Sequence, residues 1–561
     1  MVVRRFRGYT SASGEKALAA DEPPRAKTPP SPHRDGPIEA SPPERTILTR
    51  TASSSDLLNI VYLTTEAVPF AKTGGLADVC GKLPERLAAL GHRTAVIMPA
   101  FRSIYQAGVK IEPTDMSFAI PMEPGKLVGG RLLESRVPGS DVRVWFIDQP
   151  QYFARESLYG TAAGDYPDNA ERFAFFCRAA LMAISRIGWQ LDILHCNDWQ
   201  TGLVPAMIAA DRQAAAWRRR VVTWMAIHNL AYQGHFPRSA YRWVGMPWSH
   251  FRPEEFEYYD HLNFLKTGIV TADRVCTVSP RYAAEICTPE HGCGLDAVLR
   301  GVGDRLHGIL NGIDDTVWDP ATDPHLTAHY DVRTWKIGKL QNKRDLQQHF
   351  GLPPQDDLPM IGLVGRLADQ KGWDLILDVL RRHLDQSRPT QWVILGSGDA
   401  RIEQELGRLK EAFPGRFGLH IGFSDELAHR IEAASDLFVM PSRYEPCGLN
   451  QLYSTRYGTV PVVTPTGGLA DTVVDYTPES VAAGTATGFH LKSHTAQALD
   501  DAINLGLRTR YHDEKIWEKL VETGMSQDWS WRKSAAQYAE LYEQSIALSR
   551  ETTVREVSSR P

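Results

Sequence analysis

Two glycine-rich loops with identical residues are the first candidates for a binding site. Thr73 to Asp78 reads TGGLAD, and the same six letters recur from Thr466 to Asp471. Adjacent glycines let backbone N–H groups approach a ligand closely, and the start of a following helix favours anionic groups. The repeat could equally be a packing turn used twice. Because ligands bind at the carboxyl ends of strands in open α/β sheets, the pattern favours one such loop in each half of the chain.

A lysine, Lys72, directly precedes the first copy. It would add a mobile positive charge, which together with the loop amides suits a phosphate. The Walker A pattern GxxxxGK[ST] and the dinucleotide pattern GxGxxG are both absent there. The alternative interpretation is a tight turn with a solvated lysine.

Two cations stand near the first strand-like run of the second half, 360–364. They are Arg366 and Lys371, in the segment GRLADQKG. Two positive charges at a strand end would neutralise a diphosphate leaving group, which glycosyl transfer from a nucleotide sugar requires. The alternative is an ordinary surface pair.

A carboxylate, Glu445, follows the run 437–440 in the segment SRYEPCGL. Between a strand end and a helix start it can accept hydrogen bonds from sugar hydroxyls, although Glu is also common in a first helical turn. The neighbouring Cys447 could be a nucleophile beside a helix start. A buried cysteine is the commoner case, and no histidine partner is evident in the sequence.

A polar cluster, His228 with Asn229 and Gln233, follows the run 221–227, and the segment HCNDW follows another run. Such a cluster can bind a polyhydroxylated ring, although a histidine at a strand end is more often structural. HExxH, GxSxG, EF-hand and metal-ligand patterns are absent. We therefore expect neither a metal nor a cofactor.

Short apolar runs separated by helical stretches must position these residues. Their near-continuous apolarity is typical of parallel strands covered on both faces, so the fold class is α/β. The alternation restarts after a polar segment, 312–357, which predicts two domains. The runs are 57–63, 94–98, 142–147, 193–194, 221–227, 275–278 and 308–310, then 360–364, 392–395, 419–421, 437–440 and 460–463.

The predicted organisation has five parts. Residues 1–54 are rich in proline and poor in aliphatic residues, which predicts a disordered tail. Residues 526–548 should form an amphipathic helix that packs back on the first domain. The full set of boundaries is 1–54 tail, 55–315 first domain, 316–525 second domain, 526–548 helix and 549–561 frayed end.

Composition excludes several classes of protein. Lys+Arg 62 against Asp+Glu 67 gives a net charge of −5, so no basic field points to nucleic acid. No run of 18 apolar residues is present, so a membrane span is not expected. The seven cysteines form no CxxC pair, which favours a reducing, cytoplasmic location.

Ten motifs in order give the sequence a family resemblance. It closely resembles the bacterial glycogen synthases, whose pattern plant starch synthases share, from about residue 57 to 546. The motifs are KTGGLADV (72–79), DYPDNAERFAFF (165–176), HCNDWQTGL (195–203), HNLAYQG (228–234), NFLKTGI (263–269), VSPRYAAEI (278–286), LNGID (310–314), GRLADQKG (365–372), SRYEPCGL (442–449) and TGGLADTV (466–473).

The resemblance implies a GT-B fold, in which two Rossmann-like domains face a central cleft. It implies a retaining glucosyltransferase that moves glucose from ADP-glucose to the non-reducing end of an α-1,4-glucan such as glycogen. The expected partners are therefore ADP-glucose and the glucan, without nucleic acid or membrane.

The resemblance also implies a catalytic group and a substrate-binding group. His228 would lie at the reaction centre with its carbonyl near the developing oxocarbenium ion. Arg366 and Lys371 would pair with the phosphates, and Glu445 would hold the glucose hydroxyls. The expected substrate-binding residues are Lys72, Gly74, Gly75, Asp78, Asn229, Asn311, Phe423, Cys447, Gly467, Gly468 and Leu469.

Three positions depart from related patterns. Asn450 stands where the family often has Thr, and Asp260 replaces a glycine before NFLK. Tyr453, eight positions after Glu445, matches glycogen synthases but not the wider GT-B pattern, which has a glutamate near this position for the ribose. None of these removes a proposed catalytic group.

Several alternatives stay open. The first is a starch synthase or a UDP-glucose-using relative, because the choice between adenine and uracil depends on the shape of a pocket that the sequence does not show. A phosphorylase-like enzyme would need pyridoxal phosphate on a Schiff-base lysine. A non-catalytic glucan-binding protein is disfavoured because Lys72, Lys371 and Glu445 are all present.

Deletion of residues 1–54 should leave glucosyl transfer unchanged, because this segment lies outside every motif. The measurement is the rate of glucan elongation by the truncated and full-length proteins. A truncated protein that folds normally but is inactive would contradict this boundary.

Overall fold

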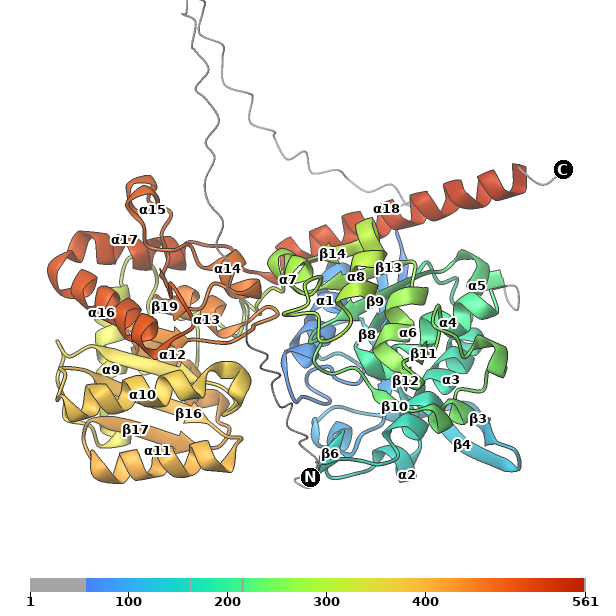
Figure 1. Ribbon diagram of the computed structural model, residues 1–561, viewed down its shortest axis with the longest axis horizontal. Coiled ribbons are helices and arrows are strands. Elements are labelled where there is room, and N and C mark those ends of the chain that lie inside the picture. Colours follow the sequence, from blue (N-terminus) through green and yellow to red (C-terminus); the bar gives the residue numbers. More distant parts are fainter. Residues whose placement is uncertain (1–56, 162–163, 213–215, 559–561) are drawn as a thin grey trace, which may run out of the picture. The chain divides into compact units, whose positions relative to one another are not determined.

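The structure is a computed structural model that describes residues 57–161, 164–212 and 216–558. The predicted tail, 1–54, lies outside the described residues. Within them, the expected alternation of strands and helices builds two largely parallel sheets, each covered by helices (Figure 1).

The first sheet has nine strands in the order β14-β13-β9-β8-β1-β2-β5-β4-β3. Seven of them are parallel, and six coincide closely with the apolar runs, because strands buried on both faces need apolar side chains throughout. The seventh, the half-buried edge strand β14, shares only Gly308 with the predicted run 308–310. The seven parallel strands are β1 (Asn59–Leu63), β2 (Arg93–Pro99), β5 (Arg143–Asp148), β8 (Ile193–Asn197), β9 (Val222–Ile227), β13 (Arg274–Thr277) and β14 (Leu306–Gly308).

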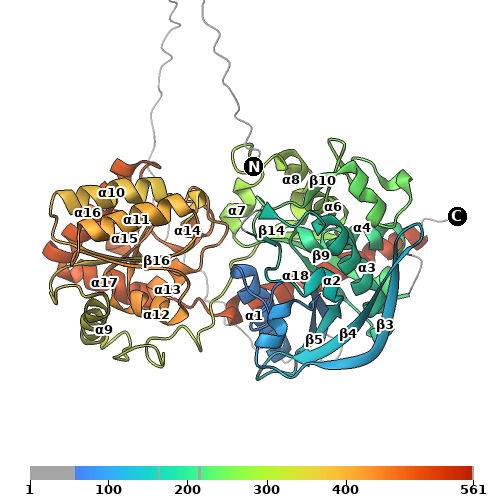
Figure 2. The same ribbon diagram turned by 90° about the horizontal axis from the view of Figure 1, so that it is seen from below.

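An antiparallel hairpin extends one edge of this sheet and was not predicted. β3 (Glu112–Glu123) and β4 (Lys126–Arg136) pair with each other, and β4 pairs with β5 (Figure 2). The turn between them, Pro124-Gly125, has a glycine with φ of +80°. Buried and exposed residues alternate along the second half of β3, so one face meets solvent and no continuous apolar run marks the strand.

The second sheet has six parallel strands in the order β17-β16-β15-β18-β19-β20. The first five match the predicted runs in the second half of the chain. They are β15 (Met360–Val364), β16 (Gln391–Gly396), β17 (Phe417–Ile421), β18 (Leu437–Met440) and β19 (Val460–Val463), followed by β20 (Phe489–His490).

The polar segment 312–357 is not a bare linker, because it contains α9 (Trp335–Phe350). Two lysines of α9 are buried. Lys339 donates to the backbone oxygens of Glu432, Ala433 and Tyr457, and Lys343 pairs with Asp436 at 3.0 Å. A helix that docks through buried lysines has a polar sequence, which explains why hydrophobic periodicity did not reveal it.

Helices cover both sheets. α1 starts directly at the first glycine loop, with Gly75 as its first residue. The longer helices are α1 (Gly75–Ala89), α3 (Asn169–Ile187), α4 (Leu203–Ala210), α6 (Phe264–Thr271), α10 (Trp373–Asp385), α11 (Ala400–Ala412), α12 (Asp425–Ala434), α16 (Ala496–His512) and α17 (Glu514–Met525); the shorter ones near the site are α7 (Pro280–Glu285), α8 (Asp296–Val302), α13 (Asn450–Arg456) and α14 (Gly467–Thr472).

The last helix, α18 (Trp531–Ser558), packs on the first sheet domain through its apolar stripe. The hydroxyl of Tyr542 lies 2.7 Å from both the Tyr62 hydroxyl and His195 Nδ1. The helix continues to Ser558, beyond the end expected at 548, because residues 549–558 contain neither Gly nor Pro. Within the described ranges, no helix is both long and apolar enough to cross a membrane.

Tyr542→Phe should destabilise the first domain by about 1–3 kcal/mol, because the buried Tyr62 hydroxyl and His195 each lose a hydrogen-bond partner. The measurement is the midpoint of thermal unfolding. Tyr511→Phe is the matched control, since Tyr511 is exposed and its hydroxyl lies 3.4 Å from the Asp357 oxygen. Equal midpoints for both variants would show that the Tyr542 contacts contribute nothing.

Candidate functional site

The predicted site residues lie just beyond the carboxyl ends of parallel strands. The Lys72 loop follows β1 and His228 follows β9 in the first sheet, while Arg366 follows β15 and Glu445 follows β18 in the second. Successive parallel strands end at the same edge of a sheet, so residues distant in sequence meet there.

An ion pair joins the two motifs of the second domain. Lys371 Nζ lies 2.6 Å from Glu445 Oε2, and the Ser442 hydroxyl donates to the same oxygen at 2.9 Å. The Glu445 side chain is 8% exposed and that of Lys371 25%. A carboxylate so far removed from water is costly unless it is paired, so its position depends on Lys371.

Arg366 stands beside this pair but is exposed, and its guanidinium donates to Gln370 at 3.2 Å. Arg366, Lys371, Ser442 and Asn450 line a small cavity of about 30 Å³. Asn450 Nδ2 donates to the Val364 oxygen at 2.6 Å, so this departure from the usual threonine still contributes to the cavity wall.

The second glycine pair packs against the backbone that carries Glu445. A Cβ at Gly467 would lie 2.0 Å from the Glu445 oxygen, and one at Gly468 would lie 2.0 Å from the Cys447 oxygen. Gly467 also has a φ of +45°, which favours glycine. The N–H of Gly468 donates to the Glu445 oxygen at 3.1 Å. This copy of TGGLAD is therefore required for close packing that fixes Glu445.

The first glycine pair, Gly74 and Gly75, faces open space. A Cβ at Gly74 would meet nothing within 4 Å, and one at Gly75 would meet only Leu449 Cδ1 of the second domain, at 3.7 Å. Lys72 in the same loop pairs with Asp78 at 2.8 Å. Burial raises the pKa of Asp78, against the lowering effect of Lys72. Because packing does not require these glycines, the open space beside them is available to a ligand.

Glu66 holds the first loop in place. Its buried carboxylate accepts hydrogen bonds from the Thr73 N–H at 2.5 Å, the Thr73 hydroxyl at 2.6 Å, the Gly74 N–H at 3.2 Å and the Tyr159 hydroxyl at 2.7 Å. Sequence reasoning did not select Glu66 as a site residue. The one available signal was an acidic residue three positions after the end of an apolar strand.

The geometry around His228 fixes its tautomer. Asn197 Nδ2 donates to the Leu63 oxygen at 2.9 Å, so Asn197 Oδ1 faces His228 Nε2 at 3.0 Å as an acceptor. Nε2 therefore carries the proton, and Nδ1 is left as an acceptor. Burial lowers the pKa of His228 to about 4, so the ring is neutral near pH 7.

Asp198 supports the backbone of His228. Its Oδ1 accepts the His228 N–H at 2.8 Å, and burial raises the pKa of Asp198 to about 7. Asp198 also has a φ of +55°, an uncommon conformation for a residue with a side chain. The HCNDW motif contains both Asn197 and Asp198, but the sequence alone did not show that they contact His228.

Cys447 is unsuited to nucleophilic attack. Its side chain is buried, and burial raises the pKa of the thiol to about 12, so it is protonated near neutral pH. It is hydrogen-bonded to the backbone of Asn311 from the first domain. The buried Oδ1 of Asn311 finds no hydrogen-bond donor among the described residues, which leaves an acceptor available.

The other predicted substrate-binding residues lie in varied settings. Asn229 is half-buried, and its Oδ1 accepts the Ala231 N–H at 3.1 Å. Phe423, just after β17, is 82% exposed. The Leu469 side chain belongs to the core of the second domain, so it is not exposed to a ligand.

The second glycine loop also contacts α7 of the first domain. Asp471 Oδ2 accepts from the Ser279 hydroxyl at 2.6 Å and the Arg281 N–H at 2.9 Å. Glu285 Oε2 accepts from the Thr466 hydroxyl and the Gly467 N–H, both at 3.0 Å. Thus the last residue of TGGLAD binds Lys72 in one copy and joins the two domains in the other.

Glu66→Gln should lower glucosyl transfer about 10- to 100-fold. The amide replaces one acceptor oxygen with a donor that faces other donors, at a cost of about 1–3 kcal/mol to the loop conformation. The measurement is kcat/KM for glucan elongation, with Glu85→Gln as the control because Glu85 lies on α1 and pairs with Lys82 outside the loop. Equal kcat/KM for the two variants would contradict the role assigned to Glu66.

Two family models match the chain. The model described as starch synthase catalytic domain matches residues 59–301, and the one described as glycosyl transferases group 1 matches residues 345–522. The two matches fall on the two sheets.

Curated proteins and a solved structure are similar over nearly the whole described chain. A glycogen synthase from Rhodopirellula baltica is 61% identical over 88% of this chain and 99% of its own length. Glycogen synthase 1 from Methylococcus capsulatus is 44% identical over 87% of this chain and 97% of its own length. The catalytic domain of starch synthase IV from Arabidopsis thaliana, solved with ADP and acarbose, is 34% identical with a TM-score of 0.80, covering 88% of this chain and all of that one. The chain therefore belongs to the glycogen synthase family, glucosyltransferases that elongate a glucan, and its two Rossmann-like domains form a GT-B fold.

Proposed function

We propose that the enzyme transfers glucose from ADP-glucose to the non-reducing end of an α-1,4-glucan such as glycogen, with retention of the anomeric configuration. The observation that carries this proposal is the ion pair between the half-buried Lys371 and the buried Glu445, beside Arg366. The solved relative that binds ADP and acarbose, a nucleoside diphosphate and a saccharide, supports the choice of donor and acceptor.

The reaction requires opposite charges to be stabilised close together. The bond between the glucose C1 and the diphosphate oxygen breaks, a bond from C1 to the acceptor oxygen forms, and the proton of the acceptor hydroxyl passes to the departing diphosphate. Negative charge grows on the diphosphate while positive charge grows on the sugar. In our proposal Arg366 and Lys371 receive the diphosphate, and Glu445 accepts hydrogen bonds from the glucose hydroxyls.

The first domain would supply the other side of the site. The loop at Gly74 and Gly75 faces open space, and together with Lys72 and the start of α1 it suits the phosphate and the transferred glucose, although the Gly74 N–H already donates to Glu66. A neutral His228 adds no positive charge to repel the developing oxocarbenium ion, and we place its carbonyl near that centre. Asp78, Asn229 and the unpartnered oxygen of Asn311 would bind sugar hydroxyls.

The second glycine loop would need a rearrangement to bind phosphate through its amides. The Gly467 N–H donates to Glu285, and the Gly468 N–H donates to the Glu445 oxygen. We propose that Gly467, Gly468 and Leu469 line the donor site through their backbone, that Cys447 shapes its wall, and that Phe423 lies near the adenine. A domain closure that separates Gly467 from Glu285 would free one N–H for the phosphate.

The proposal includes no cofactor, because the cationic side chains and loop amides supply the required charge. The phosphorylase-like alternative predicts the absorbance of a pyridoxal Schiff base in the purified protein. We also place the enzyme in the cytoplasm, on the basis of its unpaired cysteines.

Lys371→Ala should lower kcat by about two to three orders of magnitude, because loss of one preorganised charge contact costs about 3–4 kcal/mol in the transition state. Lys492→Ala is the matched control, since Lys492 forms a similar 2.7 Å pair with Asp475 but is 78% exposed. The measurement is kcat for glucan elongation with saturating donor. A normal kcat in folded Lys371→Ala would refute the phosphate assignment.

The donor is tested by supplying maltooligosaccharide with ADP-glucose or UDP-glucose in parallel and following chain elongation. Elongation with ADP-glucose in clear preference to UDP-glucose is the expected result. Preference for UDP-glucose would overturn the proposed donor, and elongation with neither would refute the proposed function.

A further inference from the structure

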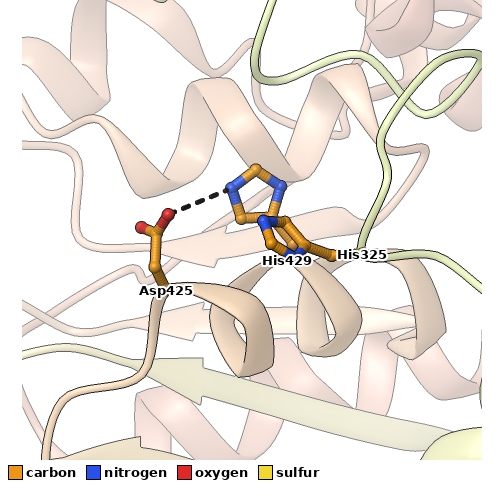
Figure 3. Close-up of side chains that lie close together, drawn as sticks. All are labelled: His325, Asp425 and His429. Carbon is orange, nitrogen blue, oxygen red and sulfur yellow. Dashed lines mark ion pairs between the residues drawn. The ribbon is translucent and has the colours of Figure 1, made fainter.

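Three potential metal ligands converge in the second domain at a place that the proposed reaction does not use. Asp425 begins α12, and His429 lies one turn later on the same helix face. His325 comes from the segment between β14 and α9. Their ligand atoms all lie within 4.8 Å of one another, and Figure 3 shows the three side chains drawn together.

The tautomer of His429 is set by its buried partners. Asp323 Oδ2 lies 2.7 Å from His429 Nδ1 and accepts the Tyr457 hydroxyl at 2.5 Å. A carboxylate can only accept there, so Nδ1 carries the proton and Nε2 presents its lone pair. A histidine whose far nitrogen donates to a carboxylate is the usual arrangement of an imidazole metal ligand.

That lone pair has no partner. The His429 side chain is 1% exposed, and its Nε2 makes no hydrogen bond with any described residue. The nearest carboxylate oxygen, Asp425 Oδ2, is 4.0 Å away, which is too far for a hydrogen bond. A buried acceptor without a donor is costly, and a bound cation would satisfy it.

The rest of the arrangement holds the imidazole rigidly. The His429 ring stacks on Trp318 with centroids 3.7 Å apart, and Trp318 stacks on Tyr453 at the same distance. Asp323 also accepts the His325 N–H through its other oxygen at 2.9 Å. One carboxylate therefore orients His429 through its side chain and His325 through its backbone.

We propose that His325, Asp425 and His429 bind one divalent transition-metal ion, of which Zn²⁺ is the best match. Two imidazoles and one carboxylate are typical zinc ligands, and a water would complete a tetrahedron. Zinc bonds of about 2.0–2.1 Å separate tetrahedral ligands by about 3.3 Å, so the present spacing must contract. Asp425 is 61% exposed and can turn inward without disturbing the core.

The ion would also affect the first domain electrostatically. Asp425 is one of the charges that raise the pKa of Asp78, the partner of Lys72. A cation on Asp425 would offset that negative charge near the first glycine loop. The proposal assigns the ion no part in glucosyl transfer itself, and it does not depend on the proposed donor or acceptor.

The test is a zinc titration of tag-free, full-length protein after dialysis against EDTA, with a competing chromogenic chelator to report free Zn²⁺. We expect one tight equivalent per chain. His325→Ala and Asp425→Asn should each weaken that equivalent at least about 10-fold, and the double variant should lose it. Neither change removes a core side chain, so both variants should fold normally. A substitution of the buried His429 could instead disrupt folding, and it is therefore not used.

Two controls separate this site from adventitious binding. Glu426→Gln changes the acidic residue next to Asp425, and His512→Gln removes an exposed histidine elsewhere in the same domain; both should retain full affinity. Co²⁺ at the site should give visible d–d bands typical of four-coordinate cobalt, and these should vanish in the double variant. Zinc affinity that is equal in wild type and the double variant, or the absence of a tight equivalent, would overturn the proposal.

Discussion

The ion pair between Lys371 and Glu445 is the contact on which the arrangement of the candidate site in the second domain depends. Its carboxylate is almost fully removed from water, and such pairs contribute little to stability because desolvation offsets their attraction. The surrounding structure nevertheless fixes it from several sides. Ser442 donates to Glu445, and the second glycine pair packs directly on the Glu445 and Cys447 backbone. A charge pair maintained at such cost is better explained by reaction electrostatics than by folding.

The TGGLAD repeat shows how one sequence serves two physical purposes. In the second domain the missing side chains permit backbone contact, and substitution would force the loop away from Glu445. In the first domain the corresponding glycines, Gly74 and Gly75, face open space, and Glu66 holds their loop by accepting hydrogen bonds from its backbone N–H groups. The aspartates differ in the same way, since Asp78 pairs with Lys72 while Asp471 binds α7. The repeated sequence therefore predicted that both loops exist, but it did not predict that one packs against backbone and the other faces open space.

The sequence was most informative where a single physical requirement dominates. Parallel strands buried on both faces need apolar residues, so nearly all of them were located. The β3–β4 hairpin was not predicted, because one of its faces meets solvent and its strands lack a continuous apolar run. Helix α9 was not predicted either, because it packs on the domain through the buried side chains of Lys339 and Lys343. Within the candidate site, residue types and spacing indicated Lys371 and Glu445 but not their pairing. The sequence did not indicate Glu66, Asn197 or Asp198, because each acts through contacts with residues that are distant in sequence. One example is the hydrogen bond between Asn197 and His228 that fixes the tautomer of His228, and another is the hydrogen bond from Tyr159 to Glu66.

We propose that Lys371 and Arg366 receive the diphosphate of the donor. A crystal structure of the enzyme with ADP would test it most directly, through the distances from Lys371 Nζ and the Arg366 guanidinium to the phosphate oxygens. We expect both cations to lie within hydrogen-bond distance of those oxygens, with Glu445 still at the edge of the same site. ADP bound with its phosphates away from both side chains would contradict it.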